Sequence, residues 1–298
     1  MEDSVDPSRP ESSSTTKKWL IGCGIGCGVV IVIGALLVTG GVLYVRNLVK
    51  GFEDSEAMLK SLTEKHGRVN EFCPAPEGSI GPDRLEAFLQ ARDATLSIRE
   101  KIESSIDTLS EGKLSGREAN EESTGGVLNK IRLGFGLIPQ IAEFYKVRTQ
   151  SLLDADMGLG EYYYIYTIAY FSWLEKPLSE GPPLQFRDGE EFRFEDWDDE
   201  EAQQLQEDIL RRRLNRMLLN MLRNQSEKLA TDEYAQVSAE WKERLAAEIE
   251  ALESESHRLV WEDGVPDAIA LSLEPFRARL ESSYSSFLST IELSVEQK

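Results

Sequence analysis

The chain is poor in the two residue types that most often hold metals and redox cofactors. Its 298 residues include two histidines, His66 and His257, and three cysteines. Zinc sites of the His-Glu-x-x-His type and di-iron sites in helical bundles need histidine spacings that these two positions do not provide. Cys73 is the one cysteine outside a long apolar run, so no disulfide within the rest of the chain and no cysteine-held cluster is expected. We therefore expect no metal and no cofactor.

Nucleotide-binding and calcium-binding motifs are also missing. Short glycine pairs occur, but none continues into a glycine-rich phosphate loop after a predicted strand. Nine acidic residues crowd the stretch 188–201, yet they lack the Asp-x-Asp-x-Asp-Gly spacing of an EF-hand loop. No set of catalytic residues stands out from the sequence, which favours a non-enzymatic role.

Positive charge is scarce after the first 50 residues. The chain has 33 basic and 53 acidic residues, of which five basic and four acidic ones lie in residues 1–50. The rest therefore carries 28 basic and 49 acidic groups, a net charge of −21. Such a surface repels phosphate backbones, so nucleic acid is excluded as an expected partner.

Against these absences stands one long apolar run, Trp19–Val45, with no charged residue in 27 positions. A bilayer core of about 30 Å needs about 20 apolar helical residues, so this run predicts a membrane span within a helix over 17–49. A cleaved signal peptide has an apolar region of about 7–15 residues, which is much shorter. The lipid bilayer, through residues 19–45, is the one partner that the sequence names directly.

Small residues four positions apart mark the first third of this run. Such spacing places them on one helix face, where a second helix can approach closely. The alternative is that glycine is simply frequent in membrane helices. Self-association and contact with another membrane protein thus both stay open for the candidate packing face, which consists of Gly22, Cys23, Gly26 and Cys27.

The counts of basic residues on the two sides of the span nearly tie, so they bear only weakly on its orientation. Three basic residues precede it and four follow within about 20 positions. Lys17 and Lys18 adjoin the span directly, which favours a single-pass signal-anchor. The remainder of the chain is then expected on the outer side of the membrane, periplasmic or extracytoplasmic.

The rest of the sequence predicts an all-α fold. Residues 1–16 are a polar tail expected to be disordered, 50–81 a juxtamembrane stalk ending at Gly67 and a proline-containing linker, and 82–298 an acidic domain of several helices.

The spacing of apolar residues and the positions of the prolines predict several helices and one interruption within this domain. One helix is expected from Pro82 through Leu109, and a kink or a break near Leu137. Another helix is expected over 227–259, and a last one from Pro275 through Ile291.

The stretch Glu161–Lys176 is apolar or aromatic on nearly every side. A helix with this composition is buried, and about 13 apolar residues are too few for a membrane span, so it is predicted to be the central helix of the domain. A strand is the alternative, because tyrosine and isoleucine favour strands. The cluster that is either core or the lining of a pocket consists of Tyr162, Tyr163, Tyr164 and Tyr166.

Two functions are compatible with these features. The first is a single-pass, membrane-anchored helical protein that acts as a non-enzymatic interaction or structural component of the membrane. The alternative is a membrane-tethered enzyme or small-ligand-binding domain whose pocket uses tyrosine, arginine and carboxylate side chains. Exposure of the tyrosine cluster in a groove would favour the second function, and its burial would count against it.

Overall fold

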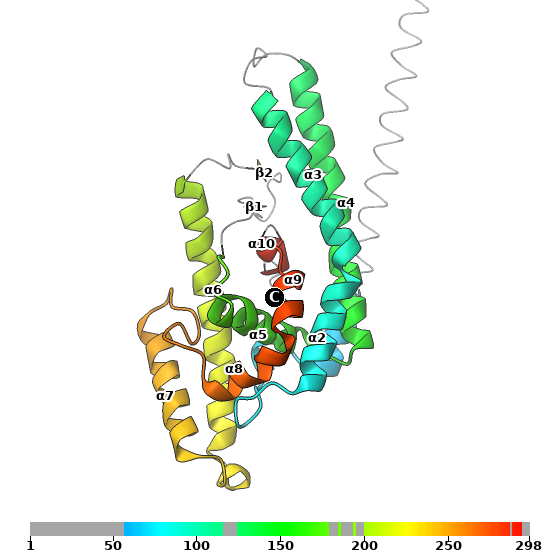
Figure 1. Ribbon diagram of the computed structural model, residues 1–298. Coiled ribbons are helices and arrows are strands. Elements are labelled where there is room, and N and C mark those ends of the chain that lie inside the picture. The colour runs from blue at the N-terminus through cyan, green and yellow to red at the C-terminus, as the bar shows by residue number, and fades with distance from the viewer. Residues whose placement is uncertain are drawn as a thin grey trace, which may run out of the picture. The chain divides into compact units, whose positions relative to one another are not determined.

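The computed structural model confirms the all-α class (Figure 1). It describes residues 57–115, 124–178, 184–185, 193–194, 200–286 and 288–293, all within the unit Gly51–Lys298. The strands it contains there are β1 (Leu184–Gln185) and β2 (Arg193–Phe194), which pair antiparallel. The predicted membrane span and the packing face from Gly22 to Cys27 lie outside the described residues. In the part that is described, no helix has the length and apolar character needed to cross a membrane.

The centre of the fold is α5 (Leu159–Tyr166), which continues as the π-helix η3 (Thr167–Trp173). Helix, rather than strand, is therefore correct for the aromatic stretch, and its side chains from Tyr162 through Phe171 are buried. The sequence did not predict the change to π geometry, in which the amide of Leu174 donates to the carbonyl of Ala169.

Two helices that the sequence joined into one precede α5 along the chain. They are α2 (Pro82–Ala94) and α3 (Leu96–Ser115), with the interruption at Thr95. The carbonyl of Arg92 accepts hydrogen bonds there from the Thr95 hydroxyl (2.9 Å) and the Arg99 guanidinium (3.0 Å). Side chains that bond the backbone in this way compete with the helical ladder, which explains the break.

The next helix, α4 (Thr124–Asp154), is uninterrupted although it contains Pro139. The expected alternative of a break near Leu137 is therefore wrong. Leu137 and Ile141 are buried on either side of the proline, so tertiary packing compensates for the hydrogen bond that proline removes. Helix α4 packs along α3, and both pack with α10 (Ser289–Leu293) around a small apolar cluster (Figure 1).

On the other side of α5 lies a helical pair, α6 (Glu200–Leu229) and α7 (Ala239–Ser254) (Figure 1). The prediction of one helix over 227–259 is wrong at both ends. The short 3-10 turn η4 (Asp232–Tyr234) separates α6 from α7, and the Ser238 side chain caps α7 by accepting a hydrogen bond from the amide of Trp241. Serine is favoured at this position because its oxygen satisfies a free amide of the first turn.

The remaining helices are short. They are α8 (Asp267–Leu273), the 3-10 turn η5 (Glu274–Phe276), α9 (Arg277–Ser283) and α10 (Ser289–Leu293). The single last helix expected from Pro275 through Ile291 is thus divided, because Tyr284 adopts extended backbone angles. This division lets α10 turn into the interior between α4 and α5.

Residues 57–66 form a helix that ends at Gly67, as predicted. Gly67 has a φ of +80°. The positive φ explains why glycine stands there. Leu62, Val69 and Ile80 belong to the same buried apolar cluster as α5, so the segment before α2 contributes to the domain core.

Candidate functional site

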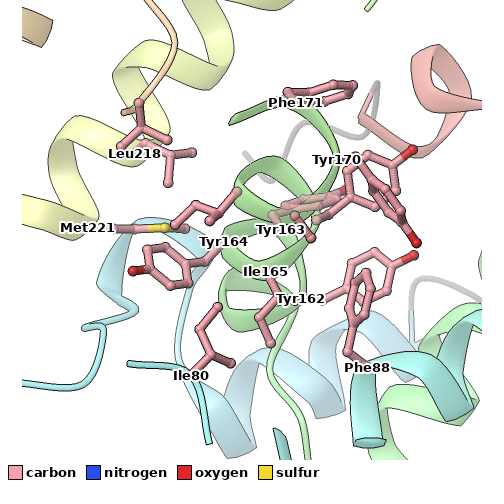
Figure 2. Packing of buried hydrophobic residues seen from close by; sticks show 14 of the residues in the cluster. Ile80, Phe88, Tyr162, Tyr163, Tyr164, Ile165, Tyr170, Phe171, Leu218 and Met221 are labelled. Carbon is pink, nitrogen blue, oxygen red and sulfur yellow. The ribbon is translucent and has the colours of Figure 1, made fainter. Parts of the chain in front are cut away.

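The four tyrosines singled out from the sequence all lie in the core. Tyr162, Tyr163, Tyr164 and Tyr166 are at most 3% exposed. Tyr162 projects from α5 toward Phe88 of α2, and Tyr164 projects toward α6 (Figure 2). The ring centroids of Tyr162 and Phe88 are 5.1 Å apart, within the range of favourable aromatic pairs. The cluster therefore packs α5 against its neighbours.

Next to these tyrosines the structure brings together charged residues that sequence reasoning missed. Arg92 of α2 and Glu292 of α10 are 200 positions apart, both are fully buried, and they form an ion pair. Tyr162 donates to the second carboxylate oxygen of Glu292 (2.9 Å) and accepts from Arg92 (3.1 Å). The three side chains form a closed set of charge-assisted hydrogen bonds.

Two further arginines complete this cluster. Arg99 of α3 is 3% exposed and donates to the carbonyl of Ser283 (2.6 Å), to which Arg92 also donates. Arg148 of α4 is 1% exposed and donates to the carbonyl of Glu292 (3.0 Å). We call Arg92, Arg99, Arg148, Tyr162 and Glu292 the arginine cluster.

Aromatic faces surround the guanidinium groups. Arg92 lies 5.2 Å from the ring centroid of Tyr166, and Arg148 lies 5.1 Å from that of Tyr145 and 5.7 Å from that of Tyr163. Cation–π contacts of this kind are strongest where water is excluded. The aromatic stretch of α5 thus supplies the environment that makes buried arginines tolerable.

The arginine cluster is not electrically balanced, because three guanidinium groups share one carboxylate. Burial is the largest influence and lowers the pKa of Arg92, but the Glu292 carboxylate and the nearby tyrosines together outweigh it, so the pKa of Arg92 is raised. Burial and the nearby Arg92 lower the pKa of Arg99. The backbone carbonyls of Arg92, Ser283 and Glu292 accept hydrogen bonds from the arginines, whereas the Nε atoms of the three arginines and the Tyr166 hydroxyl have no hydrogen-bond partner in the described part of the chain.

A sequence signal for the arginines did exist. Arg92 and Arg99 continue the buried helical spacing of Phe88 and Ile102, so each replaces an apolar residue on an inward face. A charged residue on such a face predicts a buried partner, because an unpaired buried charge is very costly. The identity of that partner, Glu292, could not be read from spacing along the chain.

On α6, Arg211 pairs with Glu207 (2.8 Å) and Arg212 lies near Asp208 (3.6 Å), so these arginines form local ion pairs. The acidic residues of the stretch 188–199 lie outside the described residues. In the described ranges, no three histidine, cysteine or acidic side chains are grouped so that they could hold a metal ion.

Chemically, the arginine cluster is suited to holding a carboxylate within a shell of tyrosines, and it holds one from its own chain. No protein-family model matches this sequence, and neither the curated proteins nor the solved structures show significant similarity to it. The fold and the arginine cluster therefore define this chain as an all-α protein with a buried arginine–carboxylate network, and any function must be argued from these residues.

Proposed function

We propose that this chain is a single-pass, membrane-anchored helical protein that acts as a non-enzymatic interaction or structural component of the membrane. The anchor is proposed from the 27 uncharged residues of Trp19–Val45. The observation that carries the non-enzymatic role is the burial of the arginine cluster, in which Arg92, Arg148 and Glu292 are at most 1% exposed.

This burial matters because a catalytic group must reach a substrate. A general acid, base or electrostatic stabiliser acts within about 3 Å of the reacting atoms. The carboxylate of Glu292 is already bonded to Arg92 and Tyr162, and these contacts join α2, α5 and α10. The residues best suited to chemistry thus stabilise the fold, which favours a role based on binding.

The membrane placement is tested by protease protection. Vesicles of known orientation that contain the full chain are treated with protease, and antibodies follow tags placed before residue 17 and after residue 298. With the N-terminal side in the cytoplasm, as Lys17 and Lys18 favour, only the second tag is digested from the outer side. Release of the untreated chain into the soluble fraction would refute the anchor.

The interaction role is tested by purification of the full chain from detergent-solubilised membranes and mass spectrometry of what co-purifies. The double variant Gly22→Ile, Gly26→Ile serves as a matched chain with a disrupted packing face. Loss of crosslinking at Cys23 or Cys27 in this variant would support pairing through the span, and undiminished crosslinking would refute it.

The second candidate, a ligand-binding domain, is favoured by one observation, which is that tyrosine, arginine and carboxylate side chains do converge. Small carboxylates and phosphates are the ligands that such groups would take. A thermal-shift screen of the wild-type chain with these compounds tests it directly. A saturable rise in Tm with one of these compounds that is absent in the Arg148→Met variant would support this function over the first.

A further inference from the structure

The last described helix, α10, is bound to the domain much as a peptide is bound to a receptor. Three side chains from other helices donate hydrogen bonds to its backbone carbonyls. Tyr145 donates to the carbonyl of Ile291 (2.8 Å), and both Arg148 (3.0 Å) and Tyr163 (2.9 Å) donate to the carbonyl of Glu292. With five residues, α10 is too short to be stable alone, so these contacts determine its conformation.

The side chains of this segment enter separate environments. Leu288 and Ile291 are fully buried in the apolar cluster formed with α3 and α4, and Leu293 is buried in the cluster around α5. Between them Glu292 reaches Arg92 and Tyr162. Apolar anchors on both sides of one carboxylate are a recognition pattern of a helix bound in a groove.

The charge of the surrounding site also fits a receptor for an acidic ligand. Without α10, the described residues at this position present three buried arginines and no acidic partner. With α10 in place, one carboxylate is added and the arginine cluster keeps an excess of positive charge. The Tyr166 hydroxyl, which is fully buried beside Arg92, has no hydrogen-bond partner among the described residues. The site therefore has more donors than α10 occupies.

We propose that Arg92, Arg99, Arg148 and Tyr162, together with the apolar positions beside them, form a binding site for an acidic–apolar helical segment. The chain fills this site with its own residues 288–293, and the same segment of a second copy fills it in exchange. A second copy is the occupant because its segment has the sequence that the structure shows to fit. Exchange of an identical element between copies preserves every contact. The proposal rests on the interaction role proposed above and names the partner.

Competition between the two segments makes the proposal measurable. The chain's own segment lowers the apparent affinity for an added one, since a ligand binds only the fraction of molecules whose site is vacant. The variant Glu292→Ala weakens the internal segment while the three arginines stay intact. Truncating one partner of a buried, hydrogen-bonded charge pair weakens an interaction by at least about 30-fold. The added segment should bind this variant more tightly by the same factor.

The experiment uses the full chain in detergent and a fluorescent peptide of residues 284–298, followed by anisotropy. We expect the peptide to bind the Glu292→Ala chain about 30-fold more tightly than the wild type. The matched control is Glu281→Ala, an exposed acid on α9 that should bind as the wild type does. A peptide carrying Glu292→Gln should bind neither chain. Equal binding of the two peptides, or none to a folded Glu292→Ala chain, would overturn the proposal.

The proposal can be tested whether or not the Glu292→Ala chain folds by itself. If Glu292→Ala does not fold alone, it is refolded with the peptide, and recovery of the helical signal only with the unmodified peptide supports the proposal. Failure to recover refutes it. Arg92→Met chains, which lack the cation opposite Glu292, should not respond to the peptide.

Exchange between copies is tested by mixing tagged Glu292→Ala and Arg92→Met chains. In the mixed pair, the Glu292→Ala chain supplies an intact site and the Arg92→Met chain supplies an intact segment. The mixed pair should therefore co-precipitate more than either variant does with itself. Equal co-precipitation in all three mixtures would refute exchange. Because these comparisons are made between chains with the same anchor, their failure leaves the membrane role untouched.

Discussion

Replacing Glu292 by glutamine should destabilise the domain strongly. The substitution keeps the size of the side chain but removes the carboxylate that, among the described residues, lies beside the three buried arginines. The hydrogen bonds from Arg92 and Tyr162 lose their negatively charged acceptor. An amide nitrogen, which is a donor, replaces one of the accepting oxygens. The guanidinium of Arg92 is then left buried without a counter-ion.

Removing one partner of a buried ion pair costs about 3–5 kcal/mol, because the other charge remains desolvated. For a domain of this size, 1 kcal/mol lowers Tm by about 2–4 °C, so the expected decrease is about 6–20 °C. The matched control is Glu253→Gln, which breaks an exposed pair with Arg223 (2.7 Å) and should cost at most about 1 kcal/mol. Thermal unfolding of the three chains, followed by circular dichroism, measures both shifts.

A double variant separates the charge from the packing. In Arg92→Met, Glu292→Leu both charges are replaced by apolar side chains of comparable size. The double variant should be more stable than the sum of the two single changes predicts, with a coupling energy of about 0.5–3 kcal/mol. If Glu292→Gln shifts Tm no more than Glu253→Gln, or if the single effects simply add, the ion pair does not stabilise the fold and the reasoning is wrong.

Three other predictions follow from the buried tyrosines and one glycine. Tyr166→Phe should leave stability unchanged or raise it by about 1 kcal/mol, because its hydroxyl is buried without a partner among the described residues. Tyr162→Phe should lower stability by about 1–3 kcal/mol, because its hydroxyl donates to Glu292. Urea unfolding measures both changes. A Cβ at Gly160 would lie 2.7 Å from the carbonyl oxygen of Val69, so Gly160→Ala should cost about 1–3 kcal/mol in the same assay, and Gly81→Ala, which meets only the mobile end of a side chain, should cost less. Finally, burial raises the pKa of Tyr162, Tyr164, Tyr166 and Tyr170, so the folded chain keeps these protons to higher pH than the unfolded chain, whose tyrosines titrate near pH 10. Their contribution to stability is complete below about pH 10 and is lost as pH rises further, so alkaline unfolding should begin there, and tyrosinate absorbance that appears without unfolding would contradict this.

Periodicity and capping chemistry determined much of the fold in advance. The aromatic run of α5 could only be stable where every side is covered, which predicted its burial without any knowledge of its neighbours. Ion pairs between residues four apart on α6, such as Arg211 with Glu207, also follow from helix geometry. These features depend on neighbours along the chain, and local sequence contains the information for them.

Helix boundaries were less well determined, since tertiary contacts select among local alternatives. Pro139 predicted an interruption of α4, but packing on both sides keeps the helix continuous. Ser238 favours a helix start at α7, yet the apolar spacing runs past it in both directions. Where two local signals conflict, the arrangement that buries more apolar surface is the more stable one.

The sequence by itself determined that the chain has one long apolar run, an acidic remainder and a central aromatic helix. Only the tertiary structure decided that Arg92 pairs with Glu292, because this contact joins residues 200 positions apart and no short-range pattern encodes it. It also decided that Tyr162 binds that carboxylate in the interior. The physical reason is that a buried charge needs a partner, whereas the position of the partner depends on how the helices pack.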